Sequence, residues 1–131
     1  MQRRTISSGS PYEPIVGYSR AVVVGKNVFV AGSAPVMQGG GDPPTGPYAQ
    51  ARRCLEIIGD ALAQAGAGFE HVVRTRVYLI RLEDFEEVGR AHGEVFRDIR
   101  PANTTVIVAG LVDPRWLVEI EADAVIASAS G

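Results

Sequence analysis

The sequence predicts an α+β fold in which a six-stranded mixed sheet carries two helices on one face. Six segments have the β-branched or alternating pattern that is typical of strands, and two segments repeat apolar residues at helical steps. Along the chain these segments follow the order β-β-β-α-β-α-β-β. Because both helical segments are amphipathic, we expect both to cover the same face of one sheet.

The first three strands are expected near the start of the chain, over residues 3–7, 18–24 and 28–32. Tyr18 and Arg20 share one face of the second strand, because side chains alternate with period 2. The turn at residues 25–27 joins the second and third strands into a hairpin. Residues 8–17 and 32–46 are rich in Gly and Pro, so we expect loops there.

The first helix is indicated by apolar residues that recur at steps of three and four: Tyr48, Ala51, Leu55, Ile58, Leu62 and Ala65. Thr45 or Gly46 is expected to cap its start, and Pro47 suits its first turn. Gly66 or Gly68 is expected to end it. Cys54 lies near this apolar stripe and is therefore expected in the core.

A long strand is expected over residues 71–81, with two alternating faces. One face holds Val73, Thr75, Val77 and Leu79, and the other holds Val72, Arg74, Arg76, Tyr78 and Ile80. Asp84 and Glu87 resemble a capping box, which begins the second helix. The apolar stripe of that helix contains Phe85, Val88, His92, Val95 and Ile99. His92 is interpreted as a packed histidine rather than a base.

The stretch of residues 100–123 is expected to form the last two strands, joined by a turn around Gly110, Asp113 and Pro114. Residues 104–109 are β-branched and apolar. The following strand alternates, with Val118, Ile120, Ala122 and Ala124 on one face and Glu119, Glu121 and Asp123 on the other.

One face of the predicted sheet is therefore charged: it carries Arg74, Arg76, Glu119, Glu121 and Asp123 among apolar residues. No expected element of the chain covers this face. Two interpretations stay open. Copies of the chain associate through the face, with Arg–carboxylate pairs inside, or the face is solvated and its ion pairs are weak.

Length and composition favour a single globular domain over residues 1–131, with 46% hydrophobic and 21% charged residues. A net charge of −2 gives no electrostatic reason to expect nucleic acid as a partner. The single cysteine fits a reducing compartment. We see no leader and no membrane-spanning run, and therefore expect a soluble, cytoplasmic protein without a membrane partner. We expect no cofactor and no metal, because the two His and one Cys lack the spacing of ligands.

Short segments in a specific order run along nearly the whole chain: Gly17-Tyr18-Ser19-Arg20-Ala21, Val28-Phe29-Val30-Ala31-Gly32 with Pro35, Gln50-Ala51, Ala65-Gly66, Val73-Arg74-Thr75-Arg76-Val77-Tyr78-Leu79, Leu82-Glu83-Asp84-Phe85, Pro101-Ala102 and Val118-Glu119-Ile120-Glu121-Ala122. In these segments the chain resembles the RidA family, which is also called YjgF-like or, by an older name, endoribonuclease L-PSP. The resemblance implies a chorismate-mutase-like fold. It also implies a homotrimer whose sheets form a central barrel, with a small-molecule pocket at each subunit interface.

The resemblance also implies a chemistry. Typical deaminating members hydrolyse 2-imino or enamine acids, and an Arg directly after Pro-Ala clamps the substrate carboxylate with a bidentate pair. Asn103 stands at that position here, and it supplies no charge. Arg20 and Arg76 are the candidates to supply a positive charge from another strand. We group Asn103, Arg20 and Arg76 as expected substrate-binding residues.

Four further site residues follow from the resemblance. Glu119 matches the acid that positions or activates the hydrolytic water, and Tyr18 matches a pocket tyrosine that holds a water or the leaving nitrogen. Thr105 matches a residue whose backbone N–H faces the ligand, and Gly32 matches a glycine whose backbone approaches it. The Gln usual after that glycine is Ser33 here.

Each of these assignments has a structural alternative. The alternative role of Tyr18 is to pack a subunit interface, and that of Glu119 is to pair with Arg74 or Arg76. The alternative role of Asn103 is to cap the turn after Pro101-Ala102. Three functions remain open: a hydrolase of small imines, enamines or related carbonyl compounds; a non-catalytic ligand-binding trimer, which the Asn103 replacement favours; and an endoribonuclease, which the acidic composition disfavours.

Overall fold

Six strands form one mixed sheet in the order β1-β2-β3-β6-β4-β5. The computed structural model describes residues 2–126. The strands are β1 Arg3–Ile6, β2 Ala21–Val24, β3 Asn27–Ser33, β4 Val72–Leu79, β5 Ala102–Ile107 and β6 Val118–Val125. The two main helices are α1 Pro47–Gln64 and α2 Phe85–Phe96. The predicted α+β fold and its element order are therefore confirmed.

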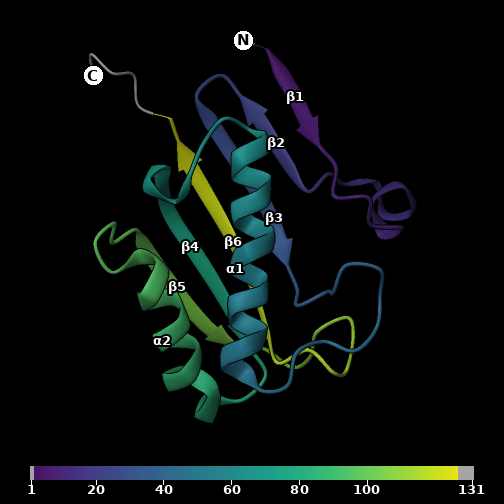
Figure 1. The fold of residues 1–131 in the computed structure, drawn as a ribbon, viewed down its shortest axis with the longest axis vertical. Helices are drawn as coiled ribbons and strands as arrows, with labels where there is room; N and C mark the ends of the chain where they lie inside the picture. The colour runs from purple at the N-terminus through teal and green to yellow at the C-terminus, as the bar shows by residue number, and fades with distance from the viewer. Residues whose placement is uncertain (1, 127–131) are drawn as a thin grey trace.

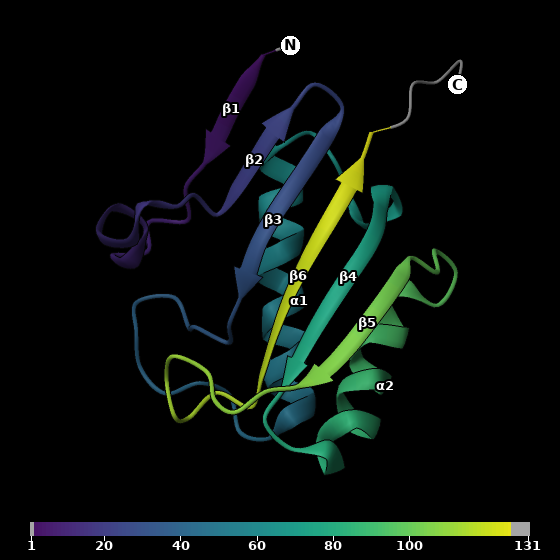
Figure 2. The same cartoon turned by 180° about the vertical axis from the view of Figure 1, so that it is seen from behind.

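Both helices lie on the same face of the sheet, as the amphipathic pattern predicts (Figure 1). The helix α1 crosses behind the centre of the sheet, and α2 lies beside it behind β4 and β5 (Figure 2). The core between the layers is built from fully buried side chains, the largest of which include Leu55, Ile58, Leu62, Leu79 and Ile120. The reverse view shows that no helix covers the other face of the sheet (Figure 2).

The strand β6 lies between β3 and β4 and carries the alternation that the sequence predicts. Val118, Ile120, Ala122 and Ala124 are buried against the helices, and the three carboxylates between them are half-buried on the other face, which we call the open face. Since two or more strands lie on either side of β6, this acidic row runs through the middle of the sheet.

The last two strands are not neighbours, although only a turn-containing connection joins them. β4 lies between β5 and β6 and pairs in parallel with β5. The helix α2 forms the crossover from β4 to β5, which parallel pairing requires. The connection of residues 108–117 passes the end of β4, so that β6 inserts between β4 and β3 at the centre of the sheet.

The predicted faces of the strand after α1 were wrong at its first two residues. Val72 is buried and Val73 is exposed, whereas strict alternation through Val77 predicts the reverse. The register with β6 shifts between Val72 and Arg74, which marks a β-bulge there. An extra residue in a bulge reverses the alternation on one side of it, because two residues then face one residue of the partner strand.

Some local expectations also differ from the structure. The region expected as a loop before the second strand contains a short helical turn, Glu13–Gly17, and β2 begins at Ala21 rather than Tyr18. The Asp84 side chain does not cap α2; it accepts hydrogen bonds from Arg81 Nε and Nη2 instead. Gly46 precedes α1 without a side-chain cap, while Gly66 follows it with a φ of +81°.

Within residues 2–126, neither helix combines the length and apolar character that crossing a membrane requires.

Candidate functional site

Arg20 is the centre of a group of site residues on the first strands. The residue is 8% exposed, and its guanidinium donates from Nη1 to the Gly32 carbonyl at 3.0 Å and to Ser33 Oγ at 3.1 Å. Its Nη2 donates to the Tyr18 hydroxyl at 3.3 Å. Because both Nη atoms already have acceptors inside the chain, Arg20 holds Tyr18 and the end of β3 in place.

Glu119 contacts the same place from β6. Its carboxylate fills the space where a side chain on Gly32 would lie. Burial raises the pKa of the Glu119 carboxyl above its usual value, Glu121 adds to this effect, and the charge of Arg20 opposes it. Tyr18, Arg20, Gly32, Ser33 and Glu119 therefore form one group, which we call the Glu119 cluster.

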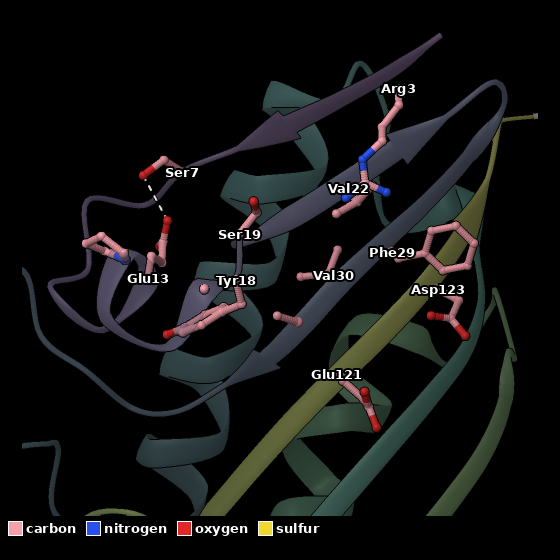
Figure 3. A pocket seen from close by; sticks show the side chains of 13 residues that line it. Arg3, Ser7, Glu13, Tyr18, Ser19, Val22, Phe29, Val30, Glu121 and Asp123 are labelled. Atoms are coloured by element: carbon pink, nitrogen blue, oxygen red, sulfur yellow. Dashed lines mark hydrogen bonds between the residues drawn. The ribbon is translucent and has the colours of Figure 1, made fainter. Parts of the chain in front are cut away.

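The loop before β2 positions Tyr18 from the other side. The carboxylate of Glu13 is buried and accepts hydrogen bonds from the Ser7 hydroxyl and from the backbone N–H and hydroxyl of Ser8. The Tyr18 N–H donates to the Glu13 carbonyl at 3.0 Å. Figure 3 shows Tyr18 between this loop and β3, at one end of a cavity of about 720 Å³ over the open face.

A test of the Glu119 cluster follows from the lack of a side chain at residue 32. In Gly32→Ala the new methyl group overlaps the Glu119 carboxylate and lies 3.1 Å from its Cδ, so Glu119 has to move. We expect the free energy of unfolding to fall by about 1–3 kcal/mol, the usual effect of overpacking. Urea denaturation measures this change.

Gly110→Ala is the matched control for that variant, because a methyl group at residue 110 meets nothing within 4 Å. Its free energy of unfolding should stay close to that of the wild type. Equal stability of the two variants would show that Glu119 does not depend on the space at Gly32.

The middle of the open face holds a second group of charges. Arg76 Nη1 lies 3.4 Å from an Asp123 carboxylate oxygen and 3.9 Å from one of Glu121. The Tyr78 hydroxyl donates to Glu121, and this hydrogen bond raises the pKa of Tyr78 to about 12. Arg76 therefore already has two carboxylate partners, and neither of them is Glu119.

Asn103 lies on the helix face of the sheet. It is paired with Thr75 in the β4–β5 register, and its Nδ2 donates to Thr75 Oγ1 at 3.1 Å. Thr75 Oγ1 lies 2.8 Å from His92 Nε2 on α2, and the Thr105 hydroxyl donates to Asn103 Oδ1 at 3.1 Å. We call these four residues the Asn103 cluster. The expectation that Asn103 caps a turn is therefore wrong.

A cavity of about 90 Å³ adjoins the Asn103 cluster. It is lined by Val77, Phe85, Val88, Gly89, His92, Asn103 and Thr105. Burial lowers the pKa of His92, which favours the neutral imidazole near neutral pH. β5 is one of the two edge strands of the sheet, so one row of its backbone N–H and C=O groups has no strand partner in the described chain.

The predicted site residues thus occupy three separate places. The structure brings Tyr18, Arg20, Gly32 and Glu119 together; it places Arg76 apart from them with its own carboxylates. Asn103 and Thr105 lie across the sheet from Glu119: their side chains point toward α2, whereas Glu119 follows the open-face row of β6. A small ligand cannot touch both clusters of one chain, because the sheet separates them.

Thr75 and His92 were missed as site residues. Thr75 is a polar side chain on the buried face of β4, where Val77 and Leu79 are its neighbours, and it is fully buried. A buried hydroxyl needs a hydrogen-bond partner. A threonine among the apolar residues of this strand face therefore indicated a buried hydrogen bond at this position. Its partners come from α2 and β5, which the sequence pattern does not place side by side.

Chemically, the two clusters offer different groups. The Glu119 cluster offers a carboxylate with a raised pKa and a phenol that Arg20 holds, and these two groups suit general acid–base chemistry on a water or a nitrogen. The Asn103 cluster offers neutral hydrogen-bonding groups next to an apolar wall. Neither cluster provides a free cation, since the Nη atoms of Arg20 are engaged within the described residues.

Comparison with known proteins identifies relatives over nearly the whole chain. The family model described as Endoribonuclease L-PSP matches residues 9–126. The structure is similar to that of Rv2704 from Mycobacterium tuberculosis, a member of the YjgF/YER057c/UK114 family, with a TM-score of 0.88 and 44% identity over 95% of this chain and 100% of that chain. The protein SCO2049 from Streptomyces coelicolor is 41% identical over 92% of this chain and 90% of its own.

A human relative has an activity in its name. The 2-iminobutanoate/2-iminopropanoate deaminase from Homo sapiens is 33% identical to this chain, over 94% of this chain and 90% of that protein. The relatives of this chain therefore include a protein named as a deaminase of small imino acids.

Proposed function

Since the chain belongs to the endoribonuclease L-PSP (YjgF, RidA) family, we propose that it is a homotrimeric hydrolase of small imines, enamines or related carbonyl compounds. The observation that carries this proposal is the Glu119 cluster. A half-buried carboxylate with a raised pKa lies against Gly32, within the electrostatic influence of Arg20, and Arg20 also holds the Tyr18 hydroxyl. Glu119 would take a proton from the attacking water, and Tyr18 would hold the leaving nitrogen.

The position of the two clusters supports a site shared between copies. Within one chain the sheet separates Glu119 from Asn103, so a ligand that contacts both needs the Glu119 cluster of one copy and the Asn103 cluster of the next. The open face also supports association. It has no covering helix, it exposes Phe29, and it holds the ion pairs of Arg76 beside the 720 Å³ cavity.

The function is tested by measuring ammonia release from a panel of freshly generated imines and enamines, with and without a carboxylate. Faster release from at least one uncharged compound than in buffer alone supports the hydrolase. If no compound is hydrolysed faster, the second candidate stands: a trimer that binds a small ligand without turning it over, which the uncharged Asn103 favours. The net charge of −2 continues to argue against RNA as a substrate.

A shared site makes a specific prediction about mixed assemblies. Glu119→Gln and Asn103→Leu are expected to be almost inactive alone, because every site lacks one half. After the two variants are unfolded together and refolded, roughly a quarter of the sites in randomly mixed cyclic trimers combine two intact halves. We therefore expect activity to return to about a quarter of the wild-type value.

Sedimentation velocity is the control for this experiment, and it should show a trimer for the wild type and for the mixture. A clean monomer at micromolar concentration would remove the shared site. A trimer that recovers no activity on mixing would show that Asn103 and Glu119 do not serve one site.

A further inference from the structure

The Asn103 cluster is a chain of hydrogen bonds in which each group donates to the next. The Thr105 hydroxyl donates to Asn103 Oδ1, and Asn103 Nδ2 donates to Thr75 Oγ1. Because Thr75 Oγ1 receives this hydrogen, its own hydroxyl hydrogen is free to point at His92 Nε2, which lies 2.8 Å away. With His92 Nε2 as the final acceptor, the ring carries its hydrogen on Nδ1, and this is the tautomer that the proposal below requires.

This direction decides what Asn103 offers to a ligand. An Asn amide has two N–H donors, and the bond to Thr75 uses one of them. Its oxygen is already engaged by Thr105. Since Asn103 lines the 90 Å³ cavity, the second N–H is the donor that the amide retains for a ligand there. Without the acceptor on His92, the Thr75 hydroxyl and the amide could reverse and present the oxygen instead.

The wall of the cavity is uncharged. Apart from the Asn103 cluster it is lined by Val77, Phe85, Val88 and Gly89, and burial keeps His92 neutral near neutral pH. A carboxylate that enters such a cavity loses its hydration and gains no cation, which is strongly unfavourable. A neutral carbonyl oxygen needs only one donor, and the second N–H of Asn103 supplies it.

We propose that His92 and Thr75 are positioning residues that fix the Asn103 amide as a hydrogen-bond donor, so that this cavity selects a neutral carbonyl group over a carboxylate. The inference rests on the proposed function only in placing the ligand at Asn103. It adds two residues outside the expected site and names the chemical class that they select: small primary amides and ketones without a free acid.

Binding of two matched probes tests the selection. We expect the assembled wild-type protein to bind 2-oxobutanamide more tightly than 2-oxobutanoate in NMR titrations. Thr75→Val keeps the shape of the side chain but removes the hydroxyl, and it should weaken amide binding by about 3- to 10-fold, the usual effect of one hydrogen bond. Thr75→Ser keeps the hydroxyl and should stay within about 2-fold of the wild type.

The histidine is tested in the same way. His92→Gln can still accept from Thr75 and should retain the preference for the amide, whereas His92→Phe should lose it. A purely structural role would weaken both probes equally, so the ratio of the two dissociation constants is the decisive quantity. Equal binding of the two probes by the wild type, an unchanged ratio in Thr75→Val and His92→Phe, or no amide binding at millimolar concentration would each overturn the proposal.

A measurement on the unmodified protein keeps the proposal testable if a variant does not fold. Long-range ¹H–¹⁵N spectra of the two histidine rings distinguish a bare ring nitrogen from a protonated one. We expect a bare Nε2 in His92. His71 is the internal reference with the opposite tautomer, because its Nδ1 accepts from the Gly68 N–H at 3.0 Å.

A protonated Nε2 in His92 would donate to Thr75 Oγ1, so His92 could not fix the direction of the chain, and the proposal would be overturned. None of these measurements uses turnover, so they can succeed or fail independently of the hydrolase assay.

Discussion

Replacing Glu119 with glutamine is expected to lower turnover by about 100-fold, the usual contribution of a general base, while the assembly stays folded. Glutamine keeps the shape of the side chain beside Gly32 but cannot take a proton from water. Burial raises the pKa of the wild-type carboxyl. The wild-type rate should therefore fall as pH decreases through this raised pKa, and the residual rate of the variant should lack that dependence. Turnover against pH, measured on both proteins, checks the prediction.

The raised pKa also predicts the direction in which the stability of Glu119→Gln changes. A carboxyl whose pKa is raised on folding contributes stability below its unfolded pKa, and this contribution is lost as pH rises through the folded pKa. Above its folded pKa, the ionised Glu119 therefore makes no favourable contribution to stability through this shift. Glu119→Gln should melt at the wild-type temperature or slightly above it.

Glu121→Gln is the matched control, because it lies on the same strand and face and is also half-buried. Its carboxylate accepts from Tyr78 and lies 3.9 Å from Arg76. We expect a lower melting temperature in this variant, with turnover per folded assembly unchanged. The opposite result for Glu119→Gln, a large fall in melting temperature with unchanged turnover, would make Glu119 structural and favour the non-catalytic binding protein.

The wild-type protein is expected to be a poor deaminase of 2-iminopropanoate and similar acids, and Asn103→Arg is expected to improve it. A charged bidentate contact to a desolvated carboxylate contributes about 2–5 kcal/mol, or roughly 30-fold to several thousand-fold in rate. The cavity beside Asn103 has room for a longer side chain, since Gly89 lines it without a side chain of its own. We therefore expect kcat/KM on 2-iminobutanoate to rise by about 30-fold or more.

Asn103→Gln and Asn103→Lys are the controls. The first changes length without charge and should bring no gain, while the second adds charge without the bidentate geometry and should bring a smaller gain than Arg. A coupled assay for the 2-oxo acid product measures all four proteins. If the wild type already reaches the rate of the arginine variant, another residue binds the carboxylate. Arg20 and Arg76 are poor candidates for this, because both Nη atoms of Arg20 and the Nη1 atom of Arg76 already have partners in the chain.

Much of the fold could be predicted from local patterns. The helical spacing of Leu55, Ile58 and Leu62 and the alternation from Val118 to Ala124 each state which side chains face the core, and the structure confirms both. Such patterns depend on the geometry of one element, in which each residue's direction follows from its neighbours along the chain. The element order, the two-helix layer and the acidic row of the open face were therefore accessible from the sequence.

The arrangement of the site was decided by contacts between distant segments. The bulge at the start of β4 reversed Val72 and Val73, because the register with β6 shifts there. Asn103 faces α2 because β5 joins the edge of β4 in parallel, with Thr75 as its partner, and only this pairing brings His92 to the same hydrogen-bond chain.

For Arg20, too, one property follows from the sequence and another only from the tertiary structure. The sequence states that it carries a positive charge on the face of Tyr18, but not that its guanidinium is buried against Gly32 and Ser33. Strand order and register are set by the free energy of the whole packed sheet, which no local pattern contains. The sequence by itself therefore determined the elements and their inward faces, and the tertiary structure decided which polar groups meet.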